Sequence, residues 1–341
     1  MYYAQREGLG PWIKNNMKKG LDQLAQAFSL SFWQEKAKVE AFFPFYHAVE
    51  AEPQPHISPL YPLISPQQFE AELKLILAHF EPIDLGELLA WVEAGRPARK
   101  PFFHLSFDDG LSSCYHVIAP ILLRLGVPAT FFINGAFIDN KCLMFRHLVA
   151  LIYSHLEERK ALGTKEADLL FSVGHAQEGE LLAWADRIGC SVPDFLAQKQ
   201  PYLKLEELKA LQSMGFSVGG HSWDHPLYKK LSLEEQLHQT EKNQQQLAAW
   251  LPQPIRAFAF PFTDHEVGLD FFDRANLDLS FGGAGIKEEM QLGRHIQRFP
   301  MEEMRIRSGE QKLKSAFAYG SLLRTLGKSK IDRRKTARRL S

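Results

Sequence analysis

The chain has 341 residues, 45% hydrophobic and 23% charged, and its 40 Lys and Arg residues balance 40 Asp and Glu residues. This composition excludes a disordered acidic chain and a protein coated in positive charge for nucleic acid, and the length supplies ample apolar material for a core. No apolar run approaches the roughly 20 residues that span a bilayer, so no transmembrane segment is predicted.

Residues 1–40 are predicted to form a helical extension ahead of the main domain. Their first half lacks the basic segment, apolar core and cleavage site of a secretory signal. The three cysteines, Cys114, Cys142 and Cys190, are odd in number and widely spaced. Such spacing favours neither a disulfide framework nor a cysteine metal site. We therefore expect a cytoplasmic protein.

From residue 41 to residue 301, short apolar runs alternate with segments of helical spacing. The predicted strands are Ala41–Val49, Pro101–Asp108, Ala129–Asn134, Phe216–His221, Ala257–Phe262, Asp278–Gly282 and Ile296–Met301. The predicted helices are Ser65–Phe80, Ser113–Leu125, Leu205–Met214, Ser232–Leu251 and Gly268–Ala275. This alternation predicts an α/β fold with a parallel sheet and crossover helices, and the number of strands favours a barrel over an open sheet.

The alternation is interrupted at about 140–202, where helical spacing continues without a clear strand. Leu143–Arg159 and Gly179–Ile188 are the predicted helices there. We interpret the segment as a helical insertion on a strand-to-helix loop, a position where insertions often shape a binding cleft. A second independent domain is the alternative.

Two adjacent carboxylates end the second predicted strand. Asp108 and Asp109 are followed by Gly110, which allows a sharp turn. Barrel enzymes place their chemistry at the carboxyl ends of parallel strands. A solvated Asp-Asp-Gly turn has the same pattern, so this segment alone leaves both interpretations open.

Two histidines four residues apart, His221 and His225, follow a later predicted strand. At this spacing both imidazoles can reach one cation, although 13 histidines in the chain would produce such pairs by chance. Because Asp109 also follows a strand end, the three side chains can converge. Two histidines and one carboxylate are typical of a catalytic metal site with open positions.

Two further segments are ambiguous on their own. Phe258–Thr263 is typical of a buried strand ended by Pro261. His47 ends the first predicted strand, where a hydrogen-bonded histidine and a catalytic one are both consistent with the sequence.

Taken together, these motifs resemble the metal-dependent polysaccharide deacetylases of carbohydrate esterase family 4. Ser-Phe-Asp-Asp-Gly (106–110) is similar to the family's Thr-Phe-Asp-Asp-Gly, and His-Ser-Trp-Asp-His (221–225) to its His-Ser/Thr-x-x-His. Pro-Phe-Thr (261–263) resembles its Pro-Tyr-Gly. Phe-Tyr-His (45–47) resembles the start of the circularly permuted subgroup that includes the biofilm poly-N-acetylglucosamine deacetylases.

This resemblance implies a distorted (β/α)7 barrel, TIM-like, over 41–301, and an activity that removes N-acetyl groups from sugars. Asp109, His221 and His225 would bind one divalent metal ion, commonly Zn²⁺ in the family, with Ni²⁺, Co²⁺ or Fe²⁺ also found. The ion would lower the pKa of the attacking water.

The resemblance also implies the roles of three further residues. Asp108 would be the general base, and His47 would protonate the leaving amine. The backbone N–H of Phe262 would help to hold the oxyanion, an interaction worth about 3–4 kcal/mol per donor.

Some positions depart from the family pattern. Ser106 replaces Thr, and Phe262 and Thr263 replace Tyr and Gly. Ala259 stands where many members have an arginine that orients the base. Arg298, at the end of the last predicted strand, is the candidate substitute, and a surface salt bridge is the alternative for it.

The predicted function is therefore hydrolysis of N-acetyl groups on a polysaccharide or on a lipid- or nucleotide-linked intermediate. A catalytically degenerate glycan-binding relative and a hydrolase of a non-sugar amide are the alternatives.

Residues 302–341 are predicted to form a basic C-terminal tail. Twelve Lys or Arg and four Asp or Glu residues lie in 301–341, so residues 1–300 carry the acidic excess. Such a tail can contact anionic lipid head groups, which would give peripheral membrane association. A disordered solubilising end is the alternative, and no nucleic-acid motif accompanies the charges.

Overall fold

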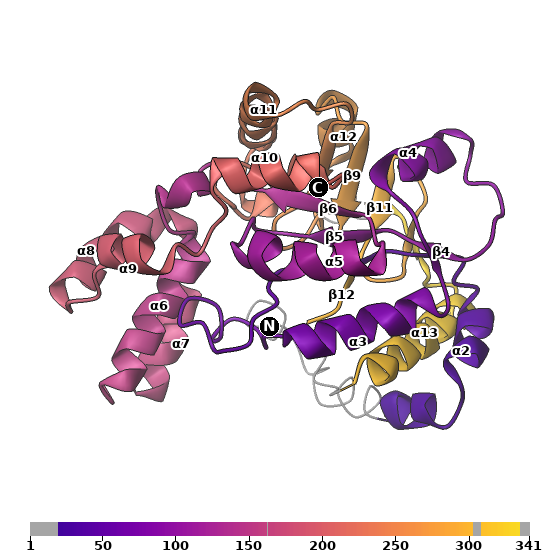
Figure 1. Ribbon diagram of the computed structural model, residues 1–341, viewed down its shortest axis with the longest axis horizontal. Helices are drawn as coiled ribbons and strands as arrows, with labels where there is room; N and C mark the ends of the chain where they lie inside the picture. Colours follow the sequence, from indigo (N-terminus) through magenta and orange to yellow (C-terminus); the bar gives the residue numbers. More distant parts are fainter. Residues whose placement is uncertain (1–19, 162, 303–307, 335–341) are drawn as a thin grey trace.

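A computed structural model describes residues 20–161, 163–302 and 308–334 (Figure 1). Its strands are β1 Ala41–Phe42, β2 Pro44–Tyr46, β3 Glu81–Pro82, β4 Phe102–Phe103, β5 Leu105–Phe107, β6 Ala129–Ile133, β7 Ser217–Gly220, β8 Ala257–Ala259, β9 Leu279–Gly282, β10 Glu288–Glu289, β11 His295–Gln297, β12 Phe299–Pro300 and β13 Lys330–Ile331. Its longer helices are α2 Leu30–Ala37, α3 Pro66–Leu77, α4 Leu85–Glu93, α5 Ala119–Leu125, α6 Phe145–Glu158, α7 Thr164–Ser172, α8 Glu178–Arg187, α9 Val192–Lys199, α10 Leu205–Ser213, α11 Leu233–Trp250, α12 Leu269–Arg274 and α13 Gly309–Thr325.

The main sheet is parallel and closes on itself, as the predicted barrel requires. Its strand order is β11-β9-β8-β7-β6-β5-β2-β12. The two strands at the ends of this order, β11 and β12, are consecutive in the chain and are separated only by Arg298. Since β11 pairs with β9 while β12 pairs with β2, the segment 295–300 bridges the first and last strands. The sheet is a distorted (β/α)7 barrel.

Helix starts follow from capping residues in the sequence. Ser65 caps α3 by accepting a hydrogen bond from the Gln68 N–H, and Pro66 occupies the first helical position. Ser232 and Glu235 form a capping box at the start of α11. These two helices begin where the sequence predicts.

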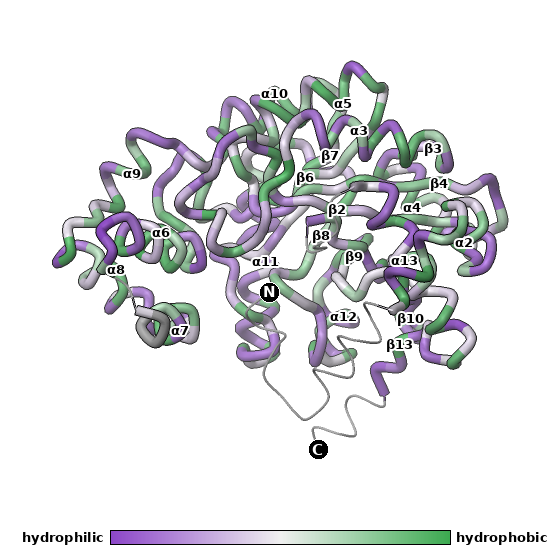
Figure 2. Tube along the Cα trace, turned by 90° about the horizontal axis from the view of Figure 1, so that it is seen from below, coloured by the Kyte–Doolittle hydropathy of each residue, from purple (hydrophilic) through white to green (hydrophobic). Residues whose placement is uncertain are grey.

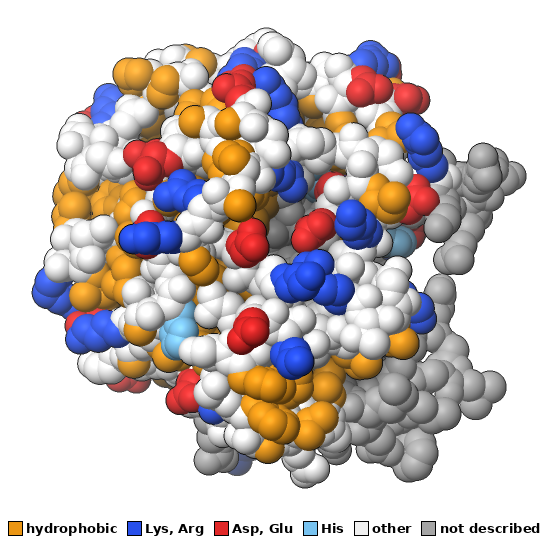
Figure 3. Space-filling model, turned by 90° about the vertical axis from the view of Figure 1, so that its right-hand side faces the viewer, with side chains coloured by type: hydrophobic (Ala, Val, Ile, Leu, Met, Phe, Trp, Pro, Cys, Tyr) orange, Lys and Arg blue, Asp and Glu red, His pale blue; other side chains and the backbone are white. Residues whose placement is uncertain are grey.

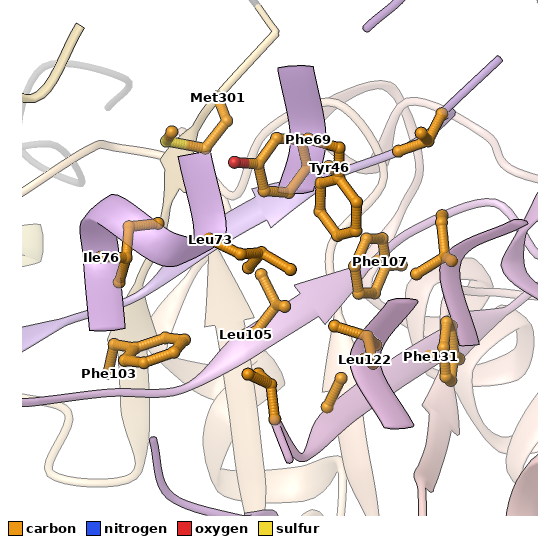
Figure 4. Close-up of a cluster of buried hydrophobic side chains, with 14 of the residues drawn as sticks. Tyr46, Phe69, Leu73, Ile76, Phe103, Leu105, Phe107, Leu122, Phe131 and Met301 are labelled. Atoms are coloured by element: carbon orange, nitrogen blue, oxygen red, sulfur yellow. The ribbon is translucent and has the colours of Figure 1, made fainter. Parts of the chain in front are cut away.

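The main core lies between the strands and the helices that cover them. Figure 4 shows Phe69, Leu73 and Ile76 of α3 beside Leu105 and Phe107 of β5, with Leu122 of α5 and Phe131 of β6 in the same cluster. Phe107 stacks on Phe131 with ring centroids 5.2 Å apart. This packing fixes the strand whose end carries Asp108 and Asp109.

The helices α6–α9 follow β6 in the chain and stand apart from the barrel in two orthogonal views (Figures 1 and 2). They have an apolar cluster of their own, which includes Leu148, Ile152 and Leu196. The segment returns to the barrel at Tyr202, which forms a β-bridge with Leu111 just after the Asp-Asp-Gly turn.

Residues 308–334, which lie in the predicted basic C-terminal tail, form a helix and a short strand. Helix α13 packs beside α2 and α3 (Figure 1), and its Leu313 and Phe317 are fully buried. Strand β13 pairs in parallel with β10. Helix α13 was not predicted, because the many positive charges of the region favoured a tail, although apolar residues recur in it at helical spacing. Among the described residues, no helix is both long enough and apolar enough to cross a bilayer.

Candidate active site

The candidate catalytic residues follow the carboxyl ends of four barrel strands. His47 follows β2, Asp108 and Asp109 follow β5, His221 follows β7, and Phe262 lies shortly after β8. Because these strands are parallel, their carboxyl ends meet at one edge of the barrel.

Asp109, His221 and His225 come together at this edge. Oδ1 of Asp109 lies 3.4 Å from Nε2 of His221 and 3.3 Å from Nε2 of His225. The three side chains are buried, and their ligand atoms lie within 4.8 Å of one another. Nδ1 of His221 lies 2.8 Å from the carbonyl oxygen of Ala259 and donates its proton to it, while Nε2 faces Asp109.

This donor set fits a divalent cation. Oδ1 of Asp109 is buried yet makes no hydrogen bond among the described residues. Burial alone would raise the pKa of Asp109, but the neighbouring His225 and His221 hold it well below its usual range, so the carboxylate is charged. One carboxylate oxygen and two imidazole nitrogens are the ligands of catalytic zinc sites.

Asp108 is held by Arg298. The guanidinium donates from Nη1 to Oδ1 and from Nη2 to Oδ2, both at 2.7 Å, and also reaches Ser106 Oγ at 2.9 Å. Burial alone would raise the pKa of Asp108, but Arg298 outweighs burial and holds the pKa below its ordinary value. Arg298 is 2% exposed, so it does not form the surface salt bridge that was the alternative. Arg298 lies between β11 and β12, where the chain joins the two ends of the sheet, and its side chain is buried inside the barrel.

His47 is paired with Glu302, a residue that the motifs do not include. Its Nδ1 lies 2.5 Å from Glu302 Oε2, while Glu302 Oε1 accepts hydrogen bonds from the backbone N–H groups of His47 and Ala48. Burial would lower the pKa of His47, but Glu302 raises it to about 10. Glu302 follows the last strand within the predicted tail, and only its position at a strand end could have suggested a role.

Phe262 occupies a tight turn beside the metal-ligand cluster. Its backbone has a φ of +59°, which is uncommon for a bulky residue. Its ring packs edge-on against His225, with centroids 4.5 Å apart. The side chain is 45% exposed, so it covers His225 on the solvent side.

A second acidic cluster lies behind this turn. Asp264, Glu289 and His295 have ligand atoms within 4.8 Å of one another. However, the guanidinium of Arg333 already contacts both carboxylates, so a cation is present among them. Neither the motifs nor the resemblance predicts this cluster.

A hollow of about 640 Å³ lies in the helical insertion, away from these groups. Its lining includes Asn140, Cys142, Glu178 and Gln200 and contains none of the candidate catalytic residues. That the insertion shapes the substrate cleft therefore stays a prediction.

Comparison with known families gives a match to the polysaccharide deacetylase model over residues 95–270. This range contains Asp108, Asp109, His221, His225 and Phe262. It ends before Arg298 and Glu302 and begins after His47. A search of the curated proteins gives no match.

Several solved structures share the fold. The deacetylase PplD from Streptococcus pyogenes is 17% identical, with 82% of this chain and 98% of that chain covered and a TM-score of 0.54. IcaB from Ammonifex degensii is 14% identical, with 82% and 97% covered and a TM-score of 0.51. A polysaccharide deacetylase from Bacillus cereus is 15% identical, with 81% and 68% covered and a TM-score of 0.52.

Proposed function

The chain belongs to the polysaccharide deacetylase family, and from this premise we propose that it hydrolyses the N-acetyl groups of an N-acetylated glycan or glycan intermediate. The observation that carries the proposal is the buried cluster of Asp109, His221 and His225, flanked by Asp108 with its arginine and by His47 with its glutamate. The circularly permuted order inferred for His47 belongs to the same proposal.

We propose that Asp109, His221 and His225 hold one divalent metal ion, with Zn²⁺ as the first candidate. When bound, such an ion supplies Lewis-acid activation of water and polarises a carbonyl oxygen. The carboxylate and both imidazoles are positioned by the barrel itself, because each follows a strand end or the turn next to it.

Asp108 is the proposed general base. Its carboxylate is charged and next to Asp109 in the chain, so it can accept the proton of the attacking water. Arg298 holds both of its oxygens and thereby fixes its direction. These two hydrogen bonds support a base-orienting role for Arg298, which is part of the same proposal.

His47 is the proposed general acid. Glu302 keeps its ring protonated at neutral pH and holds Nδ1, which leaves Nε2 to donate a proton to the departing amine. The backbone N–H of Phe262 is the proposed oxyanion donor, and the contact of the Phe262 ring with His225 supports its place near the ligand cluster.

Release of acetate from N-acetylglucosamine oligomers tests the proposal. We expect release by the purified protein, its loss on treatment with a chelator, and its recovery on addition of Zn²⁺. Asp108→Asn should lower turnover by about 10²- to 10⁴-fold while metal content is retained. Stoichiometric metal binding without acetate release from any acetylated glycan would contradict the proposal and favour a binding protein. Release from a non-sugar acetamide alone would assign a different substrate class.

We also propose contact with anionic membrane lipid through exposed cations near the C-terminus, namely Lys328, Lys330 and Arg334. Such residues attract anionic head groups by about 1 kcal/mol each. A cytoplasmic location, where the substrate would be a biosynthetic intermediate, is part of the same proposal.

A further inference from the structure

One cation near the C-terminus points inward. Arg333 is 6% exposed and follows β13, which is anchored by its parallel pairing with β10. The guanidinium packs over the ring of Phe272, with its carbon 4.8 Å from the ring centroid. Arg333 therefore belongs to the interior behind the Phe262 turn.

The guanidinium of Arg333 donates hydrogen bonds both to the loop that follows the Phe262 turn and to strand β10. Nη1 donates to the backbone oxygens of Asp264 at 3.0 Å and Val267 at 3.4 Å, and Nη2 to the carboxylate of Asp264. Nε and Nη2 also reach the two carboxylate oxygens of Glu289 at 3.1 and 2.8 Å. One side chain thus joins the loop 264–267 to β10.

Asp264 extends this anchor to the other side of the loop. Its Oδ2 lies 3.0 Å from His295 Nε2 and accepts a hydrogen bond from Gln297 at 2.8 Å. Its Oδ1 accepts one from the backbone N–H of Gly283 at 3.3 Å. Burial raises the pKa of Asp264, and His295 and Arg333 bring it far below its usual range, so this acid is charged.

Phe262 lies two residues before Asp264, and its backbone has to be held. A non-glycine residue at positive φ costs of order 1–3 kcal/mol and persists only when the surroundings over-determine it. The hydrogen bond from Thr263 N–H to Pro261 O, at 2.6 Å, closes the turn locally. Among the contacts between described residues, Asp264 is the side chain next to this turn that ties it to other strands.

We propose that Arg333 is a positioning residue for the hydrolysis, which fixes the Phe262 turn through Asp264 and thereby aims the Phe262 N–H at the reacting carbonyl. This inference rests on the proposed function. A buried pair of acids without a cation would repel, and the guanidinium both neutralises them and gives them one geometry. In this proposal, Arg333, from the C-terminal part of the chain, acts on the turn that carries the oxyanion donor.

The test compares Arg333→Met and Arg333→Lys with Arg334→Met, an identical substitution at the next, exposed position. We expect Arg333→Met to lower kcat by roughly 100-fold, with KM and metal content unchanged, because a displaced donor affects the transition state. Arg333→Lys should lose less turnover than Arg333→Met, because it keeps the positive charge. It should stay below wild type, since one ammonium cannot span all of these acceptors. Methylguanidinium added to Arg333→Ala should restore part of the lost turnover.

Amide hydrogen exchange supplies a readout that does not depend on activity. Residues 261–267 should exchange faster in Arg333→Met than in Arg334→Met, even if the wild-type protein released no acetate and the proposed function failed. A folded Arg333→Met protein with the kcat and exchange of Arg334→Met would overturn the inference. If Arg333→Met does not fold, Arg333→Lys, which keeps the charge, carries the same comparison.

Discussion

Three ion pairs at or beside the candidate site, two of them buried and that of His47 partly buried, join residues that are far apart in the chain. Arg298 meets Asp108 across 190 positions, Glu302 meets His47 across 255, and Arg333 meets Asp264 across 69. Removal of one partner from a buried pair leaves an uncompensated charge and typically costs 3–5 kcal/mol. These pairs therefore affect stability as well as chemistry, and each test must separate the two.

Arg298→Met removes both hydrogen bonds that orient Asp108. We expect turnover to fall by about 100-fold or more, because a misdirected base loses most of its general-base contribution. Stability should fall by about 3–5 kcal/mol in chemical denaturation. Metal content should stay unchanged, since Arg298 contacts none of the proposed ligands. The control is Arg294→Met, which removes an exposed arginine from the preceding segment; unchanged turnover in Arg298→Met would reject the orienting role.

Glu302→Gln tests the charge on His47. A general acid works while protonated, so activity is lost as pH rises through the pKa of His47, and Glu302 raises that pKa to about 10. Without the carboxylate, the alkaline limb of the kcat/KM profile should move to lower pH by about one to three units. Glu52→Gln, an exposed acid nearby, should leave the profile in place. An unmoved limb in Glu302→Gln would show that another group is the acid.

The same pair makes stability depend on pH. The pKa of His47 is higher in the folded state than its usual 6.5, so its contribution is fully present below about pH 6.5 and is lost as pH rises through about 10. Wild-type and Glu302→Gln proteins should therefore differ most in unfolding free energy just below pH 6.5, differ less as pH rises, and converge above pH 10.

At the level of elements, apolar runs and capping residues predicted the barrel well. β6 and β9 are buried throughout and lie within the predicted ranges, and the predicted helices around α3, α10 and α11 are present. Three predicted strands are each divided in two, because the chain changes its pairing partner between Phe42 and Pro44, between Phe103 and Leu105, and at Arg298. Pairing of this kind depends on distant strands and has no local signature.

Helix α13 was missed because its charges outweighed its apolar spacing. Leu313, Phe317 and Leu323 lie on one face and are buried. Gly320 is on the same face, where an added Cβ would lie 1.9 Å from the Ile286 side chain. The close approach that this glycine allows is a property of the folded chain and could not be inferred from the residues near it.

The buried ion pair of α13 predicts a stability effect without a catalytic one. Lys312 donates to Glu72 at 2.7 Å, and Glu72 also accepts from the Tyr46 hydroxyl at 2.9 Å. Lys312→Met should lower the free energy of unfolding by about 3–5 kcal/mol, because Glu72 is left buried and charged. Turnover at 25 °C should be unchanged.

Lys314→Met is the matched control, since its partner Glu310 is exposed and such pairs contribute about 0.3–0.5 kcal/mol. Combining Lys312→Met with Glu72→Gln should recover part of the loss, as the orphaned charge is removed. Equal losses in the single and double variants would show that packing, not charge, is responsible.

For the whole molecule, the motif spacing predicted that Asp109, His221 and His225 converge, because parallel strands share one carboxyl edge. The partners Glu302 and Arg333 could not be predicted, since they lie in the region assigned to a tail and carry no motif. The net charge of zero combines an acidic excess in residues 1–300 with a basic excess in residues 301–341. Figure 3 shows Lys and Arg interspersed with Asp and Glu on the face where α2 lies, so no uniform basic face covers that side.

The proposed membrane contact can be tested at the exposed cations Lys328, Lys330 and Arg334 of the described segment. Replacing Lys328, Lys330 and Arg334 by Gln should weaken partition onto vesicles containing phosphatidylserine by about 3 kcal/mol, or roughly two orders of magnitude. Arg333 is left in place, so the buried anchor and the turnover of a soluble substrate should persist.

The matched control replaces Lys100, Lys141 and Lys209, three exposed lysines on other elements. Added salt should weaken the wild-type partition, since exposed charges are screened. Equal partition of both triple variants, or equal binding to neutral vesicles, would rule out lipid contact through this end of the chain.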